Sequence, residues 1–229
     1  MSVPWLVVSP HCDDAVFGCG ELLAAHPGSA AVTVFAGTPP SYEPFTEWDC
    51  ACGFRPGDDV MALRRDEDAC ALALLAARPV WLPFLDSQYR DTPSASAVAR
   101  ALDEVISRQC PRAIAFPLGL FHSDHQLVRD AVLQLAAREG VPPLTVYQDA
   151  LYRRIPGAVE QQTAHMAVLG FHLRERTRAA PPHAHALKRA AIDCYRSQLR
   201  ALATPGRPGH LDAYGPERYM DLVFTATAV

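Results

Sequence analysis

The chain has 229 residues, of which 49% are hydrophobic, so it can form one domain with a full hydrophobic core. Its formal net charge of −4 argues against a nucleic-acid binder, because such proteins carry a basic surplus. Residues 1–5 lack the features of a signal peptide, and no run of about 18 apolar residues could span a membrane. Seven scattered cysteines fit a reducing compartment, so we expect a cytoplasmic protein.

Apolar or β-branched runs alternate along the chain with helical patterns. We predict strands at residues 5–8, 31–36, 79–84, 112–116 and 144–147, and helices at residues 15–26, 60–77, 94–109 and 127–138. This alternation predicts a single α/β domain, a Rossmann-like three-layer sandwich with a mostly parallel central sheet. We expect the part after about residue 150 to be more irregular.

Residues 37–58 form a long stretch that is rich in proline and glycine and has no hydrophobic periodicity. A stretch of this length inside a compact domain is typical of a functional loop or lid. Its aromatic side chains, among them Trp48, could stack on a sugar or could equally pin the loop to the core. Arg64 on the next predicted helix could contact sugar hydroxyls or a phosphate; a surface pair with Glu67 is the alternative.

The polar turn after the first predicted strand concentrates groups that bind metal ions or transfer protons. It reads His11, Cys12, Asp13 and Asp14. Open α/β sheets place their ligands beyond the carboxyl ends of strands, which is where this turn lies. One aspartate could simply cap the following helix, but capping does not account for a histidine and two adjacent carboxylates.

A second polar cluster, His122, Ser123, Asp124 and His125, follows the predicted strand at residues 112–116. Residues three apart at a helix start lie close together, so His122 and His125 can share one small volume. If the first and fourth strands are neighbours, both clusters open onto the same crevice. A His/Asp set of metal ligands with room for water is typical of a catalytic zinc site.

The two clusters resemble the paired motifs of the LmbE-like (PIG-L) de-N-acetylase family, His-Pro-Asp-Asp and His-x-Asp-His. Other stretches are similar in order and spacing, and the resemblance extends from about residue 5 to about residue 200. They are Gly18, Cys19 and Gly20; Arg64, Glu67, Ala71 and Leu75; Asp86; and Lys188, Ala191, Tyr195, Ser197 and Gln198.

The resemblance implies a zinc-dependent enzyme that removes an N-acetyl or other N-acyl group from a 2-acylamino sugar conjugate. Such a conjugate is a small molecule or a glycosylated natural product. One zinc ion would be held by His11, Asp14 and His125. Asp13 would act as the general base, and His122 would polarise the acyl oxygen or protonate the leaving amine.

Four further residues complete the expected site. Asp124 could keep His122 charged, because a nearby carboxylate raises the pKa of a histidine. We expect Arg64, Trp48 and Asp86 to contact the substrate, the last of these on the resemblance alone.

The chain also departs from the family pattern. Cys12 replaces the proline of the first motif and is either a further ligand or a small buried side chain. Ala15 stands where many members carry an acid, and Glu21 replaces a glycine. Two other functions compete with deacetylation: a non-catalytic protein that keeps the fold and binds a sugar, a nucleotide or another ligand, and a metal-dependent hydrolase of esters or phosphates. The sequence has no glycine-rich phosphate loop to support the latter.

Overall fold

In the computed structural model, which describes residues 3–136 and 138–224, seven strands form one sheet in the order β3-β2-β1-β4-β5-β7-β6. The strands are β1 (Trp5–Ser9), β2 (Ala30–Thr33), β3 (Arg78–Trp81), β4 (Ala113–Pro117), β5 (Leu144–Tyr147), β6 (Phe171–Arg176) and β7 (Tyr219–Phe224). The pairs among β1 to β5 are parallel, and β7 is antiparallel to both β5 and β6. The predicted α/β fold with a mostly parallel sheet is therefore confirmed.

Both faces of the sheet are buried, which explains why the central strands are apolar throughout. In β1, Trp5 and Val7 pack into one hydrophobic cluster, whereas Leu6 and Val8 pack into the other. Successive side chains of a strand point to opposite faces, so a strand covered on both sides needs apolar residues at every position.

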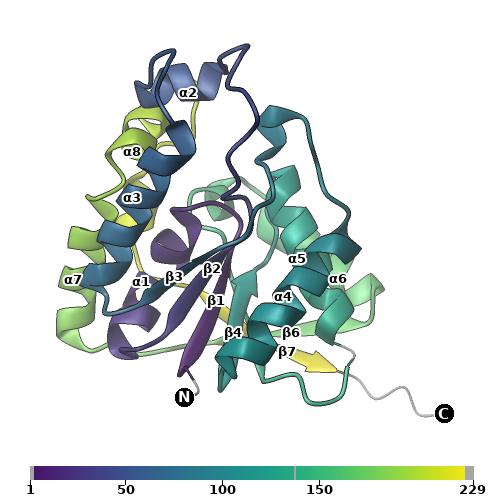
Figure 1. Cartoon of the computed structure of the whole chain (residues 1–229). Coiled ribbons are helices and arrows are strands. Elements are labelled where there is room, and N and C mark those ends of the chain that lie inside the picture. The colour runs from purple at the N-terminus through teal and green to yellow at the C-terminus, as the bar shows by residue number, and fades with distance from the viewer. Residues whose placement is uncertain (1–2, 137, 225–229) are drawn as a thin grey trace.

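The helices divide between the two faces (Figure 1). One face is covered by α1 (Asp14–Ala25), α3 (Val60–Leu74) and α7 (Pro182–Ile192), and the other by α4 (Ala95–Gln109), α5 (Ser123–Ala136) and α6 (Ala158–Val168). The short helices α2 (Glu47–Cys52) and α8 (Arg196–Leu202) lie together beyond the carboxyl ends of the strands. The described residues also include three 3-10 turns, at Ser87–Tyr89, Tyr152–Arg154 and Leu211–Tyr214.

Helix α1 is broken at Cys19, where the backbone leaves helical angles, as the two flanking glycines predict. A Cβ atom at Gly18 would lie 2.7 Å from the ring of Tyr147, and one at Gly20 would lie 2.7 Å from Cγ of Lys188. Side chains at these positions would push α1 away from its neighbours. The glycines therefore allow the helix that follows the first motif to pack closely.

Both segments that we expected to be irregular contain some regular elements. The part after residue 150 contains three helices and the strands β6 and β7, which lie at one edge of the sheet. The loop at residues 37–58 contains α2, whose first turn is capped by Oγ1 of Thr46 accepting the N–H of Asp49. Six residues are too few for periodicity to show in the sequence.

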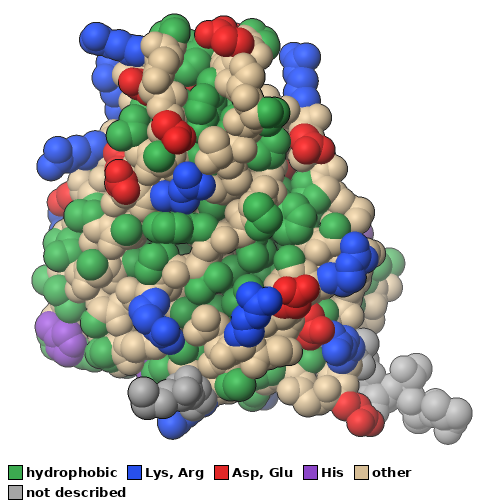
Figure 2. All heavy atoms as spheres, viewed as in Figure 1, with side chains coloured by type: hydrophobic (Ala, Val, Ile, Leu, Met, Phe, Trp, Pro, Cys, Tyr) green, Lys and Arg blue, Asp and Glu red, His purple; other side chains and the backbone are tan. Residues whose placement is uncertain are grey.

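Figure 2 shows acidic and basic side chains interspersed over one face of the molecule. Among the described residues, no helix combines the length and apolar character needed to cross a membrane.

Candidate active site

The two polar clusters meet because β1 and β4 are adjacent parallel strands, as expected from the sequence. From β1 the sheet continues to β2 and β3 on one side, and from β4 to β5 on the other. Such a reversal of strand order opens a crevice at the carboxyl ends of the strands, where open α/β sheets bind ligands. The first cluster follows β1 directly, and the second follows β4 after a short loop.

A cavity of about 600 Å³ occupies this crevice. Its lining includes five residues of the two clusters, namely His11, Asp13, Asp14, His122 and His125. The three residues predicted to contact the substrate, Trp48, Arg64 and Asp86, also line it. The structure thus brings eight of the nine predicted site residues to one cavity, and the ninth, Asp124, lies buried beside it.

Three side chains converge on one point of the cavity. Nδ1 of His11 and Nε2 of His125 each lie 3.2 Å from Oδ2 of Asp14. The ligand atoms of these three residues all lie within 4.8 Å of one another, close enough to hold one metal ion. Two histidines and one carboxylate are a ligand set that zinc accepts, and three protein ligands are typical of its catalytic sites.

Each histidine of this cluster uses its other ring nitrogen to contact a buried carboxylate. Nε2 of His11 lies 3.0 Å from Oδ2 of Asp124, and Nδ1 of His125 lies 2.6 Å from Oδ1 of Asp149. Metal-ligating histidines usually donate their second N–H in this way, because the contact fixes the ring and its tautomer.

Asp149 is a site residue that sequence reasoning missed. Its Oδ2 accepts the backbone N–H groups of Gly119 and Leu120 at 3.0 and 3.1 Å, so the carboxylate is held firmly beneath His125. The available signal was its position two residues after β5, at the same edge of the sheet as both motifs.

The protonation pattern of the two histidines suits a cation. If Asp124 and Asp149 each accept a proton from the ring nitrogen that faces them, the nitrogens that face Asp14 are the ones that can offer lone pairs to a metal ion. Without a metal, protons on these nitrogens offset the charge of Asp14, and a bound cation would take their place. Burial alone would lower the pKa of His125, but Asp14 and Asp149 raise it to about 9, so the surroundings favour positive charge here.

A second group, His11, His122 and Asp124, is also compact enough to hold an ion. In this group Oδ2 of Asp124 contacts Nε2 of His11 and accepts the backbone N–H of Ser87 at 3.2 Å, which suits a residue that orients His11. Cys12 belongs to neither group and is buried in the hydrophobic core.

Asp13 lies beside the cluster without being part of it. Burial and the neighbouring Asp14 carboxylate raise the pKa of Asp13 to about 6. Arg64 and His11 oppose that rise. A carboxyl group with a pKa near neutrality can both accept and return a proton at physiological pH.

The expected pairing of Asp124 with a charged His122 is not what the structure shows. Asp124 contacts His11 instead, and its Oδ2 lies 4.0 Å from Nδ1 of His122. Burial, with the neighbouring His11 and His125, lowers the pKa of His122 to about 4, so its ring is neutral. Nδ1 of His122 accepts the backbone N–H of Asp124, which leaves the proton of the neutral ring on Nε2.

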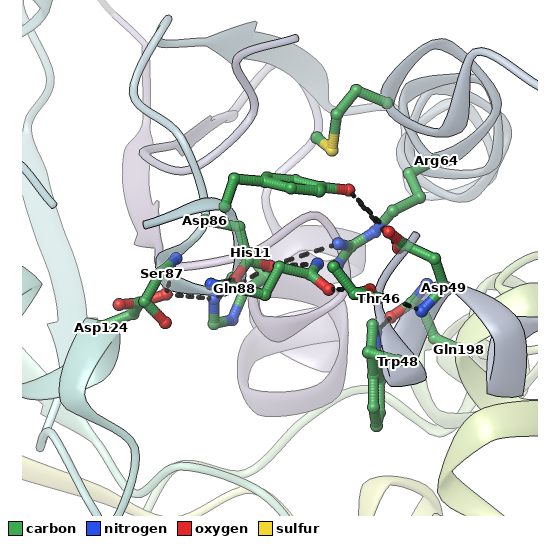
Figure 3. Close-up of polar contacts among 12 residues, drawn as sticks. His11, Thr46, Trp48, Asp49, Arg64, Asp86, Ser87, Gln88, Asp124 and Gln198 are labelled. Atoms are coloured by element: carbon green, nitrogen blue, oxygen red, sulfur yellow. Dashed lines mark hydrogen bonds and ion pairs between the residues drawn. The ribbon is translucent and has the colours of Figure 1, made fainter. Parts of the chain in front are cut away.

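The wall contributed by α2, α3 and the turn after β3 is tied together by polar contacts (Figure 3). Arg64 is only 2% exposed, and its Nη1 lies 3.4 Å from Oδ2 of Asp86. The alternative surface pair of Arg64 with Glu67 does not form, since Glu67 accepts hydrogen bonds from Ser197. Trp48 donates from Nε1 to Gln198 at 3.2 Å, which fixes its ring at the cavity wall.

Comparisons with known proteins find similar structures among deacetylases. The crystal structure of the A40926 pseudoaglycone deacetylase Dbv21 is 27% identical over 100% of both chains, with a TM-score of 0.80. The zinc-inhibited form of teicoplanin deacetylase Orf2 is 26% identical, with a TM-score of 0.83, over 99% of this chain and 100% of that one. No curated protein is significantly similar in sequence.

A more distant structure shares the fold alone. The N,N'-diacetylchitobiose deacetylase from Pyrococcus horikoshii is 18% identical, with a TM-score of 0.54, over 85% of this chain and 70% of that one.

The family model described as PIG-L, GlcNAc-PI de-N-acetylase, matches residues 6–136, which is more than half of the chain. The chain therefore belongs to the PIG-L de-N-acetylase family, as its paired motifs predict.

Proposed function

We propose that the protein is a zinc-dependent amidohydrolase that removes the N-acetyl group from a 2-acetamido sugar joined to a larger molecule. The observation that carries the proposal is the convergence of His11, Asp14 and His125, with each histidine oriented by its own carboxylate. Asp13 lies next to this cluster on the cavity wall, where a general base is needed. Family membership supports the same reaction.

In this proposal His11, Asp14 and His125 hold one zinc ion, which when bound supplies the Lewis acidity that activates water and polarises an amide carbonyl. Asp13 accepts the proton of the attacking water, because its pKa of about 6 leaves it ionised at neutral pH. The same carboxyl, once protonated, returns the proton to the amine that leaves. Its near-neutral pKa makes both transfers favourable.

In this proposal His122 polarises the acyl oxygen, one of its two expected roles, but as a neutral imidazole and not as a charged one. Its neutral ring carries the proton on Nε2 and lines the cavity. We infer that this N–H donates a hydrogen bond to the acyl oxygen as negative charge develops there, the task of an oxyanion-hole donor. Asp124 acts indirectly, because its carboxylate orients the ring of His11.

The mouth of the cavity favours a substrate with a bulky apolar part. Phe121 is 69% exposed although its ring packs 5.4 Å from that of Tyr152, and both line the cavity. The Trp48 ring, also in the lining, lies beneath the guanidinium of Arg207 at 5.2 Å. Related deacetylases of known structure act on A40926 pseudoaglycone and bind teicoplanin. We therefore propose an amino-sugar conjugate with a large, partly aromatic aglycone.

The test is acetate release from a panel of N-acetylglucosaminides by the zinc-loaded protein, comparing wild type with Asp13→Asn. Asp66→Asn is the matched control, because Asp66 is exposed on α3 and belongs to neither predicted metal group. We expect wild type and Asp66→Asn to release acetate and Asp13→Asn to lose at least about 100-fold in rate. Tight binding of the panel with no acetate from any member would favour a non-catalytic sugar-binding protein.

A further inference from the structure

Two cysteines that the proposed reaction does not use face each other across two helices. Cys70 lies on α3, and Cys194 lies in the turn between α7 and α8. Their Sγ atoms are 3.0 Å apart, although 124 positions separate them in the sequence. This distance is shorter than an ordinary contact between unbonded sulfur atoms, so both side chains are already aimed at each other. Both residues are accessible, Cys70 being exposed and Cys194 partly so.

We propose that Cys70 and Cys194 form a reversible disulfide when the protein meets a small-molecule disulfide such as oxidised glutathione. The site is separate from the cavity, since neither cysteine is part of its lining. The inference does not rest on the proposed deacetylase function.

The exchange runs through two steps that balance. The thiolate of Cys70, the more exposed residue, attacks one sulfur of the small disulfide and releases the other as a thiolate, which takes up a proton. The sulfur of Cys194 then loses its proton to water and attacks Sγ of Cys70, which releases the second small thiol. In sum the two protein thiols lose two electrons and two protons, and one small disulfide becomes two thiols.

The surroundings favour this order of attack. Burial and the adjacent Cys70 thiol raise the pKa of Cys194 to about 12, so Cys194 stays protonated at neutral pH and is the poorer first nucleophile.

The disulfide would lie beside hydrogen bonds that already join α3 to residues 195 and 197; we call this set of bonds the seam. Tyr195 donates from its hydroxyl to Asp68 at 2.8 Å, and Ser197 donates from its backbone N–H and its hydroxyl to Glu67 at 2.9 and 2.6 Å. These bonds join α3 to the residues that directly follow Cys194. A covalent bond at the end of this seam therefore requires little movement of the backbone, and it would restrict the unfolded chain over a long loop.

The cross-link would also restrict the relative movement of two helices that form part of the cavity wall. Arg64 on α3 and Gln198 on α8 both line it, and the seam joins the two helices. We therefore expect oxidation to stabilise the protein without closing the cavity.

The test oxidises the purified full-length protein with oxidised glutathione and maps its cysteine peptides by mass spectrometry, with a melting curve on the same samples. We expect a peptide pair joining Cys70 to Cys194 and a melting temperature raised by several degrees, both reversed by dithiothreitol. Cys70→Ser and Cys194→Ser should each abolish the pair and the shift. Cys110→Ser, which removes an exposed thiol outside the pair, should leave both unchanged.

Recovery of Cys70 and Cys194 as free thiols, or as separate glutathione adducts, would overturn the inference. A shift in melting temperature that persists in Cys70→Ser would overturn it as well, because the stabilisation would then come from another cysteine.

Discussion

Replacing Asp149 by asparagine should weaken metal binding without removing any ligand. In wild type, Oδ2 of Asp149 accepts two backbone N–H groups and Oδ1 faces Nδ1 of His125 at 2.6 Å. An asparagine has one oxygen and one NH₂ group to place at these two positions. Pointing the NH₂ group at the two amides would leave both unpaired, at a cost of about 1–3 kcal/mol each, so the oxygen stays there and the NH₂ faces His125.

The NH₂ group then donates to Nδ1, which forces the proton of the His125 ring onto Nε2. That nitrogen faces Asp14 at 3.2 Å and can no longer offer a lone pair to a metal. Loss of such an orienting partner typically lowers metal affinity 10- to 100-fold, which corresponds to about 1.4–2.7 kcal/mol.

Competition for zinc between the protein and a chromophoric chelator measures this change. Melting curves of the metal-free proteins show whether Asp149→Asn is folded, and Asp66→Asn serves again as the control on an exposed acid. An Asp149→Asn variant that folds and binds zinc as tightly as wild type would refute the argument that Asp149 sets the tautomer of His125.

Three further predictions follow from other parts of the site. Trp48→Ala should reduce deacetylation of conjugates with bulky aglycones more than that of N-acetylglucosamine, because its ring forms part of the cavity wall; equal losses would contradict a role in aglycone binding. His122→Ala should lower kcat about 100-fold with a much smaller change in KM, since its N–H acts mainly in the transition state; a change confined to KM would show a binding role instead. Burial raises the pKa of Asp68 to about 7. As the pH rises from about 4 toward 7, the folded protein keeps a proton on Asp68 that the unfolded chain loses, so this carboxyl destabilises the folded state more and more. Urea unfolding should therefore show Asp68→Asn gaining stability relative to wild type between pH 4.5 and pH 8, and a difference that does not change with pH would contradict the assigned burial.

The candidate metal cluster could be predicted because its residues come from two short stretches of the chain. His11 and Asp14 follow one strand and His125 follows another, so only the adjacency of β1 and β4 was needed to unite them. Asp149 stands alone after β5, and its role arises from contacts with a loop some thirty residues earlier, which the sequence does not reveal.

Asp124 shows the opposite error, because nearness in sequence suggested the wrong partner. It is two residues from His122, yet the start of α5 turns its carboxylate toward His11, which is 113 positions away in the chain. The last two strands at one side of the sheet, β7 and the edge strand β6, escaped prediction for a related reason. The sequence of β6 has only two apolar residues, Phe171 and Leu173, and ends in three consecutive charged residues, and its pairing with β7 spans more than forty residues.

The central claim is tested most directly by removing the metal and returning it to the same enzyme. The experiment adds a chelator and then zinc in steps up to one equivalent per chain; it avoids excess zinc because a related deacetylase has a zinc-inhibited form. We predict that acetate release from an N-acetylglucosaminide disappears with the metal and returns in proportion to the zinc bound, reaching its maximum near one ion per chain. Acetate release that survives complete removal of the metal would contradict the account.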